Sequence, residues 1–146
     1  KHVPTPSFVL CSSPAGITED SRTIRNQYGL LYNAGVFSGS TSLVTEGWKI
    51  PNHLGDWDKL RNFLGGDSKV AEALSIAGFV GKPGGRRDAD EPFAFQEKDE
   101  VGYWWFSSVD GYNCWALSIN PSNVSVPQST NTYSRGYGFS IRFIRQ

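Results

Sequence analysis

The chain has 146 residues with fourteen basic and fourteen acidic side chains, and 14% of its residues are aromatic. This length suits a single domain, and the aromatic content excludes intrinsic disorder. The balanced charge removes the attraction on which nucleic-acid binding depends, and no apolar run approaches the roughly 18 residues of a membrane span. Because the chain begins with Lys1 and lacks Met, we expect a processed product or a piece of a longer protein.

The N-terminal residues 1–27 contain three Pro and many Ser and Thr. This composition predicts an extended arm, in which the apolar run 8–10 is compatible with an edge strand. We expect the folded domain to comprise residues 28–146. Its first segment, residues 28–33, fits a strand and a short helix equally well.

Two short helices are predicted in the middle of the chain. Trp57, Leu60 and Leu64 recur at helical spacing, and two glycines follow them as a stop signal. A second helix is predicted within residues 67–78, with Val70 on its buried face. The residues from 82 to 100 are expected to form a loop.

Strands are predicted in the C-terminal half, where the apolar pattern changes to a period of two. Residues 101–108 place large aromatic side chains on both faces, which predicts a strand covered on both sides, with residues 114–119 as its partner. Asp110-Gly111 is a typical hairpin turn between them. Residues 139–143 are predicted to form the last strand, and the polar run 120–138 is expected to be a loop. The predicted fold class is α+β.

The sequence contains two cysteines, Cys11 and Cys114. Two cysteines are too few to define a disulfide framework, so we favour two separate buried thiols. The alternative is one disulfide across a loop of about a hundred residues, which the chain-entropy model values at about 4.7 kcal/mol.

No catalytic constellation is visible in the sequence, and we expect a protein that is not an enzyme. Only His2 and His53 are available as imidazole bases, and no Gly-x-Ser-x-Gly elbow accompanies them. The His and Cys residues are too scattered for a zinc site, and no phosphate-binding glycine loop occurs, so we expect no metal and no cofactor.

Several carboxylates gather in the loop between residues 82 and 100. Interleaved basic residues favour a solvated loop, and a Ca²⁺ site or a glycosidase-like carboxylate pair are the alternatives. The carboxylates are those of Asp88, Asp90, Glu91, Glu97, Asp99 and Glu100.

The aromatic residues favour binding over catalysis. Trp and Tyr present an apolar face with a polar tip, which suits stacking on sugars or anchoring a protein partner. Most of the Trp residues lie on apolar stripes and are predicted to be in the core. The candidate ligand-binding residues therefore come from the later turns and loops, and they are Tyr112, Asn120, Asn123, Asn131, Tyr133, Arg135 and Tyr137.

Several short pieces of the sequence occur in a characteristic order. They are YGLLYN at 28–33, GWKIP at 47–51 with DWDKL at 56–60 and LGG at 64–66, YWWFSS at 103–108, and GFSIRFIR at 138–145. In this order they resemble the Fibrobacter succinogenes major paralogous domain family.

The resemblance to this family implies a fold. Parts of the motifs are also similar to the formylglycine-generating sulfatase-modifying enzymes, which implies a C-type lectin-like fold. Such a fold has two helices packed on small twisted antiparallel sheets, long loops on one side, and terminal strands that lie close together. The Glu-Pro-Asn calcium motif of the lectins is absent, because Phe93 follows Glu91-Pro92.

The resemblance also implies a location and a role. Similar family members occur largely in surface-exposed or secreted bacterial proteins, so we expect an extracellular, cell-surface or virion location. We expect a non-catalytic binding or adhesion module that presents residues 82–100 and 120–138 to a protein or glycan ligand, without membrane insertion. The alternative is a structural or assembly domain of a larger bacterial surface protein, pilus or phage virion, in which these loops contact neighbouring subunits.

Overall fold

The computed structural model describes residues 8–10, 21–37, 43–66, 69–70, 81–120 and 129–146. Three of the predictions fall wholly or mostly on other residues. Cys11, Asn123 and the predicted second helix beyond Val70 lie outside the described part of the chain.

The largest sheet has three antiparallel strands in the order β6–β7–β8. The strands are β6 (Gly102–Asp110), β7 (Asn113–Ile119) and β8 (Ser129–Ser134). A two-residue loop joins β6 to β7, since Asp110 pairs with Asn113 and Gly111 has the positive φ of 59° that such a loop needs. This confirms the predicted hairpin.

Strand β8 corrects the expectation of a loop over residues 120–138. Its side chains are mostly Ser, Thr and Asn, so no apolar alternation marks it as a strand. Its pairing runs in unbroken register with β7, from Asn113 opposite Ser134 to Ser118 opposite Ser129. Backbone hydrogen bonds to the edge of β7 therefore hold a polar strand in place.

The core lies on both faces of this sheet. On one face Trp104 and Phe106 pack with Trp57, Leu117 and other buried side chains. On the other face the buried cluster contains Tyr103, Trp105, Cys114, Ala116, Phe139 and Ala34. The predicted strand with aromatic side chains buried on both faces is confirmed.

Three two-stranded antiparallel sheets complete the β-structure. They pair β1 (Phe8–Leu10) with β2 (Leu30–Tyr32), β3 (Trp48–Lys49) with β9 (Ile144–Arg145), and β4 (Arg86–Arg87) with β5 (Phe95–Gln96). Strand β1 is the apolar run predicted as an edge strand. The β4–β5 pair forms within the segment that was expected to be a loop.

The helix predicted around Trp57 is confirmed in two parts, a π-helical turn η2 (His53–Trp57) and α2 (Asp58–Phe63). Asn52 begins it, because its Oδ1 accepts hydrogen bonds from the backbone N–H groups of Gly55 and Asp56. After Leu64, two glycines at positive φ end it.

Helix α1 (Ser21–Tyr28) corrects the expectation of an extended arm for residues 21–27. Ile24 and Tyr28 lie one turn apart and pack against Leu31, which is fully buried. A single buried aliphatic side chain in an otherwise polar helix is too weak a pattern to predict. Gly29, at φ 82°, ends the helix and donates its N–H to Arg25 O at 2.9 Å.

The C-terminal segment also differs from the single strand predicted over residues 139–143. Gly138 bridges to Arg87, Phe139 to Tyr32 and Ser140 to Trp104, before β9 pairs with β3. One stretch of chain thus joins the small sheets to the central one, and the fully buried ring of Phe139 lies where they meet.

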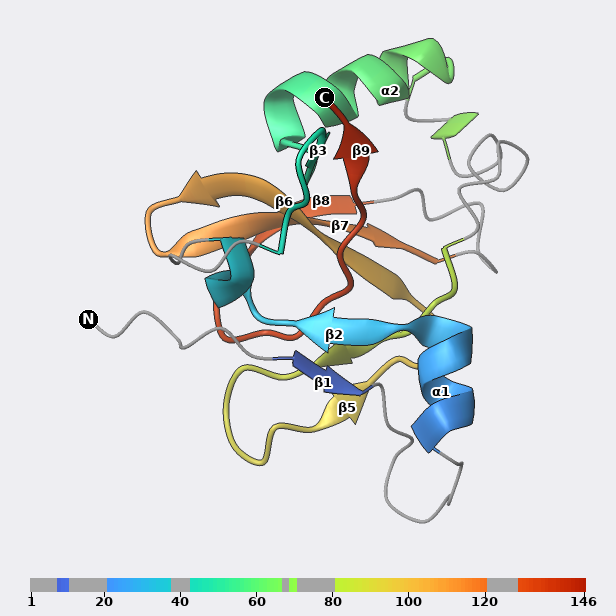
Figure 1. Cartoon of the computed structure of the whole chain (residues 1–146), viewed down its shortest axis with the longest axis vertical. Coiled ribbons are helices and arrows are strands. Elements are labelled where there is room, and N and C mark those ends of the chain that lie inside the picture. Colours follow the sequence, from blue (N-terminus) through green and yellow to red (C-terminus); the bar gives the residue numbers. More distant parts are fainter. Residues whose placement is uncertain (1–7, 11–20, 38–42, 67–68, 71–80, 121–128) are drawn as a thin grey trace.

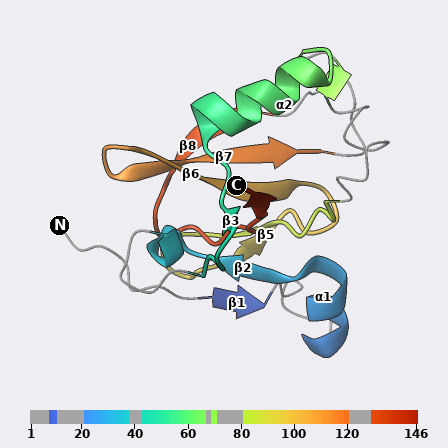
Figure 2. The same cartoon turned by 45° about the horizontal axis from the view of Figure 1, so that its top comes forward.

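The helices lie on opposite sides of the central sheet. In Figures 1 and 2, η2 and α2 lie on one side of β6–β8, whereas α1, β1 and β2 lie on the other, with the short η1 turn (Ala34–Phe37) following β2. The predicted α+β class, with two helices and small antiparallel sheets, is confirmed. Within the described residues, no helix combines the length and the apolar character of a membrane span.

Candidate functional site

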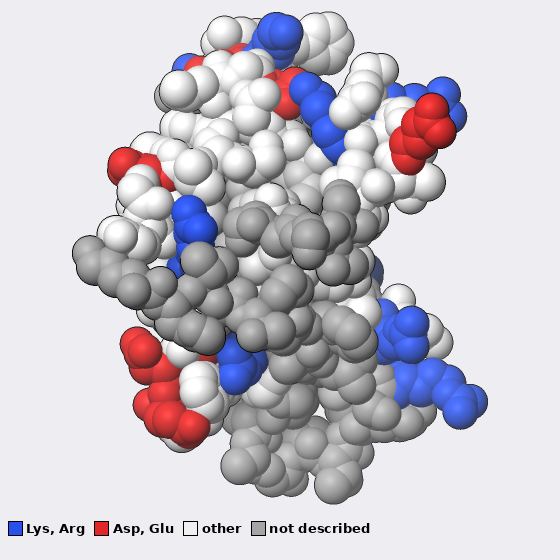
Figure 3. All heavy atoms as spheres, turned by 60° about the vertical axis from the view of Figure 1, so that its left-hand side comes forward, with Lys and Arg blue, Asp and Glu red and all other residues white. Residues whose placement is uncertain are grey.

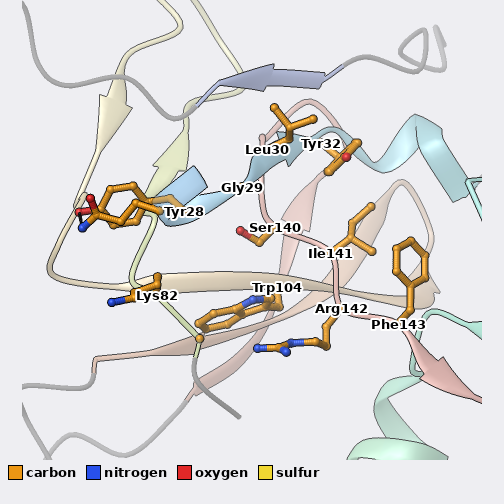
Figure 4. Close-up of a pocket in the computed structure, with 12 residues that line it drawn as sticks. Tyr28, Gly29, Leu30, Tyr32, Lys82, Trp104, Ser140, Ile141, Arg142 and Phe143 are labelled. Carbon is orange, nitrogen blue, oxygen red and sulfur yellow. Dashed lines mark hydrogen bonds between the residues drawn. The ribbon is translucent and has the colours of Figure 1, made fainter. Parts of the chain in front are cut away.

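A surface pocket of about 430 Å³ opens between the end of α1, strand β2, strand β6 and the C-terminal segment (Figure 4). We call it the Trp104 pocket. Its lining residues are Gln27, Tyr28, Gly29, Leu30, Tyr32, Gly81, Lys82, Trp104, Ser140, Ile141, Arg142 and Phe143.

The backbone around the Trp104 pocket is held by main-chain hydrogen bonds. Tyr32 and Phe139 exchange both of their N–H···O bonds, at 2.7 and 3.0 Å. Ser140 donates to Tyr103 O at 3.0 Å, and its own carbonyl accepts from Trp105 N at 3.0 Å. The backbone of Tyr32 and Ser140 in the lining is therefore held by hydrogen bonds to neighbouring elements.

The indole of Trp104 has a fixed position because it packs on Gly102. A Cβ added at Gly102 would lie 2.0 Å from Cη2 of this indole, which leaves room for hydrogen alone. Trp104 is 7% exposed, so most of its surface belongs to the core and only a small part faces the pocket.

Two cationic side chains flank this indole. Figure 4 shows Trp104 between Lys82 and Arg142. Lys82 is exposed and Arg142 is partly buried. The described residues that line the pocket include no Asp, Glu, His or Cys, so the side-chain charge of these residues is positive.

Tyr28 closes one end of the pocket through a chain of hydrogen bonds. Gln27 Nε2 donates to the Tyr28 hydroxyl at 2.8 Å, and this hydroxyl donates to Asp99 Oδ1. Lys98 lies 3.3 Å from Asp99 Oδ2, and its Nζ is 5.2 Å from the centre of the Tyr28 ring. The hydrogen bond from Tyr28 lowers the pKa of Asp99, so this carboxylate, which is not among the lining residues, stays ionised.

A smaller apolar pocket of about 230 Å³ adjoins the first. Trp104 and Arg142 line both pockets, and the smaller one also contains Trp57, Leu60 and Leu117. Arg142 therefore lies between a charged, aromatic pocket and an apolar one.

Comparison with protein families gives one match. The model of the Fibrobacter succinogenes major domain matches residues 8–145 of the chain. The chain belongs to this family. The match begins at β1, so it includes the strand and the helix that precede Tyr28. The comparison with curated proteins and the comparison with solved structures gave no match.

In this Fibrobacter succinogenes major domain, the pocket lining coincides with the sequence pieces that carry the family resemblance. Residues 28–30, Tyr32, Trp104 and residues 140–143 belong to those pieces, whereas Gln27, Gly81 and Lys82 do not. Sequence reasoning had assigned these pieces to the scaffold alone.

The predicted ligand-binding residues of this Fibrobacter succinogenes major domain lie elsewhere, and none of the six described ones lines the Trp104 pocket. Tyr112 is 63% exposed at the tip of the β6–β7 hairpin. Arg135 lies beside this tip and donates from Nη2 to Gly111 O at 3.3 Å. Asn131 is exposed on β8, whereas Asn120 lies at the other end of β7 from the hairpin tip.

Two of the predicted tyrosines pack inward. The Tyr133 ring meets the Phe139 ring edge-on with centroids 4.9 Å apart, and the Tyr137 ring lies 5.6 Å from Phe139. Tyr133 also contacts Tyr103 edge-on at 6.1 Å. The structure therefore gives both tyrosines a packing role in the core cluster of β6, β7 and Phe139.

The acidic loop does not form a cation site in the part of the chain that the structure describes, where no group of three or more potential metal ligands converges. Arg86 lies 3.3 Å from Asp88 and 3.4 Å from Glu97. Glu97 also accepts a hydrogen bond from the Tyr103 hydroxyl at 2.6 Å. Burial is the largest cause of the raised pKa of Tyr103, and this hydrogen bond is the next, so the phenol stays protonated. The carboxylates of Asp88 and Glu97 therefore serve as local partners of Arg86 and Tyr103.

Proposed function

We propose that this domain is a non-catalytic binding module that works outside the cell and holds a protein or glycan ligand in the Trp104 pocket. Its scaffold, in this proposal, is C-type lectin-like. The three-stranded sheet with helices on opposite sides supports this assignment, as does the pairing of β9 with β3, which places the C-terminal strand against the first half of the chain.

One observation carries the proposal: Lys82 and Arg142 flank the indole of Trp104 in a surface pocket. Cations bind ligands through charge-assisted hydrogen bonds, and aromatic faces bind them through stacking. Both interactions stabilise a bound ligand without a proton transfer or a covalent step. The lining is therefore suited to recognition.

The distribution of charge favours a ligand with local charge over a long polyanion. The chain has no net charge, and basic and acidic side chains both occur on the face shown in Figure 3, where some of them adjoin one another. A nucleic acid is bound chiefly through an extended basic surface. We therefore do not propose nucleic acid as the partner.

The test of this proposal compares two double variants with the same change in net charge. Lys82→Gln with Arg142→Gln removes both cations of the pocket, and Lys59→Gln with Arg145→Gln removes two exposed cations outside it. Each protein is applied to an array of bacterial glycans and peptides after its melting temperature has been measured. Capture that the pocket variant loses and the control retains supports the proposal. Equal capture by both folded variants contradicts it.

A structural or assembly role is the second candidate function. It is supported by two apolar side chains of the η2–α2 segment, because Leu54 is 77% exposed and Phe63 is 86% exposed. Contiguous exposed apolar patches mark surfaces that contact another subunit, whereas single exposed apolar side chains are normal, so two side chains make this the second candidate. Light scattering of the purified chain tests it. Self-association that Leu54→Ser and Phe63→Ser abolish would favour assembly over ligand capture.

A further inference from the structure

We infer that the ligand of the Trp104 pocket is an acidic saccharide, in which a sugar ring carries a carboxylate. This inference rests on the proposed function, since it specifies the ligand of the same site. It assigns the carboxylate to Lys82 and Arg142 and the sugar ring to the aromatic part of the lining.

The charge of the lining selects an anion. Arg142 offers a planar fork of N–H donors that matches a carboxylate, and Lys82 adds a second positive charge with a long reach. Arg142 is partly buried, so its field is screened less by salt than that of an exposed side chain. The neighbouring Asp99 is engaged by Tyr28 and Lys98, so it does not compete from within the pocket.

The remainder of the lining suits a sugar ring. The half-buried Tyr28 and Tyr32 provide most of the aromatic surface, to which Trp104 adds the small part that faces the pocket. Gln27 and Ser140 provide hydrogen-bonding groups beside it. A sugar ring has apolar C–H faces and a rim of hydroxyl groups, and it uses both kinds of surface. The volume of about 430 Å³ lies within the range of pockets that enclose small ligands.

An extended peptide that adds to a strand edge fits this site less well. In this mode of peptide binding, main-chain hydrogen bonds join the peptide to a free edge of a sheet. Here Tyr32 is already bridged to Phe139, and Ser140 already bonds to Tyr103 and Trp105. The edge positions at these points are occupied by the protein's own C-terminal segment, so side-chain recognition of a compact ligand is favoured.

The experiment uses three probes of equal length: a galacturonic acid trimer, the same trimer with its carboxylates methyl-esterified, and a neutral galactose trimer. A peptide of three glutamates is the fourth probe. Binding to the whole chain is followed by isothermal titration and by the NMR shift of the Trp104 indole N–H. The variants are Lys82→Gln and Arg142→Gln, with Lys59→Gln and Arg145→Gln as matched controls.

We expect the galacturonic acid trimer to bind and to shift the Trp104 signal, with affinity falling as salt is raised. Lys82→Gln and Arg142→Gln should each weaken binding by about tenfold, because each removes one charge-assisted contact. Esterification should weaken binding by more than either variant does, because it removes both contacts. The two control variants should bind as the unchanged protein does.

Other results would overturn the inference in distinguishable ways. Equal binding of the ester or the neutral trimer at Trp104 refutes the acidic ligand but leaves a binding pocket. Equal binding of the glutamate peptide refutes the saccharide. Failure of the galacturonic acid trimer to bind refutes the inference, while pocket-dependent capture on the array would still support the proposed function. If the folded Lys82→Gln and Arg142→Gln variants bind the galacturonic acid trimer as the unchanged protein does, both the inference and the proposed function are refuted.

Discussion

The imidazole of His53 stacks on the indole of Trp115, with ring centroids 4.2 Å apart and ring planes at 12°. The Nδ1 of His53 is buried and has no hydrogen-bond partner among the described residues. Burial lowers the pKa of His53 below its ordinary value; nearby Asp58 raises this pKa and Arg61 lowers it further. The burial of this ring therefore favours the neutral imidazole.

The lowered pKa of His53 predicts that the free energy of unfolding of the domain depends on pH. Because the pKa of His53 is lower in the folded state, the unfolded chain binds the proton more readily, and the free energy of unfolding rises with pH between the two pKa values. The contribution should be complete above about pH 6.5 and should be lost as the pH falls through the folded pKa. Urea unfolding between pH 5 and 8 measures it.

The control for this measurement is His53→Phe, which keeps an aromatic ring against Trp115 but cannot titrate. Carboxylates titrate mostly below this pH range, and His2 is present in both proteins. The variant should show a smaller increase in stability with pH. An identical pH profile would contradict the assignment to His53.

Asn52→Ala should destabilise the domain by about 1 kcal/mol, because it removes the side-chain cap of the η2–α2 segment. Asn52 N also donates to Asp56 Oδ2 at 3.0 Å, so the pair satisfies backbone donors reciprocally. Urea unfolding gives the change. Asn62→Ala, at an exposed position of α2, should change the stability by less than about 0.5 kcal/mol. Equal losses of stability in Asn52→Ala and Asn62→Ala would contradict a stabilising role of the Asn52 cap.

Gly102→Ala should damage both stability and binding, since the new methyl group would overlap the Trp104 ring. Overpacking of this kind costs about 1–3 kcal/mol, and the displaced indole would move within the pocket. Thermal unfolding and near-UV circular dichroism report the two effects. Gly111→Ala meets no atom within 4 Å and is strained only by its φ of 59°, so its ligand binding should be unchanged. An unperturbed Trp104 signal in Gly102→Ala would be inconsistent with this packing.

Tyr133→Ala should lower the stability by about 2 kcal/mol, because its ring is half-buried against Phe139. Tyr112→Ala, at the exposed hairpin tip, should leave the melting temperature nearly unchanged. Differential scanning calorimetry compares the two. If both variants melted like the unchanged protein, Tyr133 would have no packing role, and its earlier interpretation as a ligand-binding residue would regain support.

Strands β6 and β7 of the central sheet could be predicted because the alternation of buried side chains is visible within each strand's own sequence. The alternation in residues 101–108 places Tyr103 and Trp105 on one face and Trp104 on the other, as the two core clusters have it. Asp110-Gly111 identified the hairpin for a similar reason, since a two-residue loop depends on backbone preferences of the turn itself.

Other elements could not be predicted, because their support comes from distant residues. Strand β8 has polar side chains and depends on the backbone edge of β7. Helix α1 is held by the packing of Ile24 on Leu31, a contact with the following strand. The C-terminal segment satisfies its backbone by bridging to Arg87, Tyr32 and Trp104 in turn, and no local pattern encodes these partners.

The candidate site shows the same division. The amino-acid order was sufficient to assign aromatic side chains to buried faces, to locate the hairpin and to indicate the family, because each depends on neighbouring residues. It was not sufficient to bring Tyr28, Lys82, Trp104 and Arg142 to one pocket. Their approach depends on hydrogen bonds of the C-terminal segment to β2 and β6, which form only when the whole core is packed.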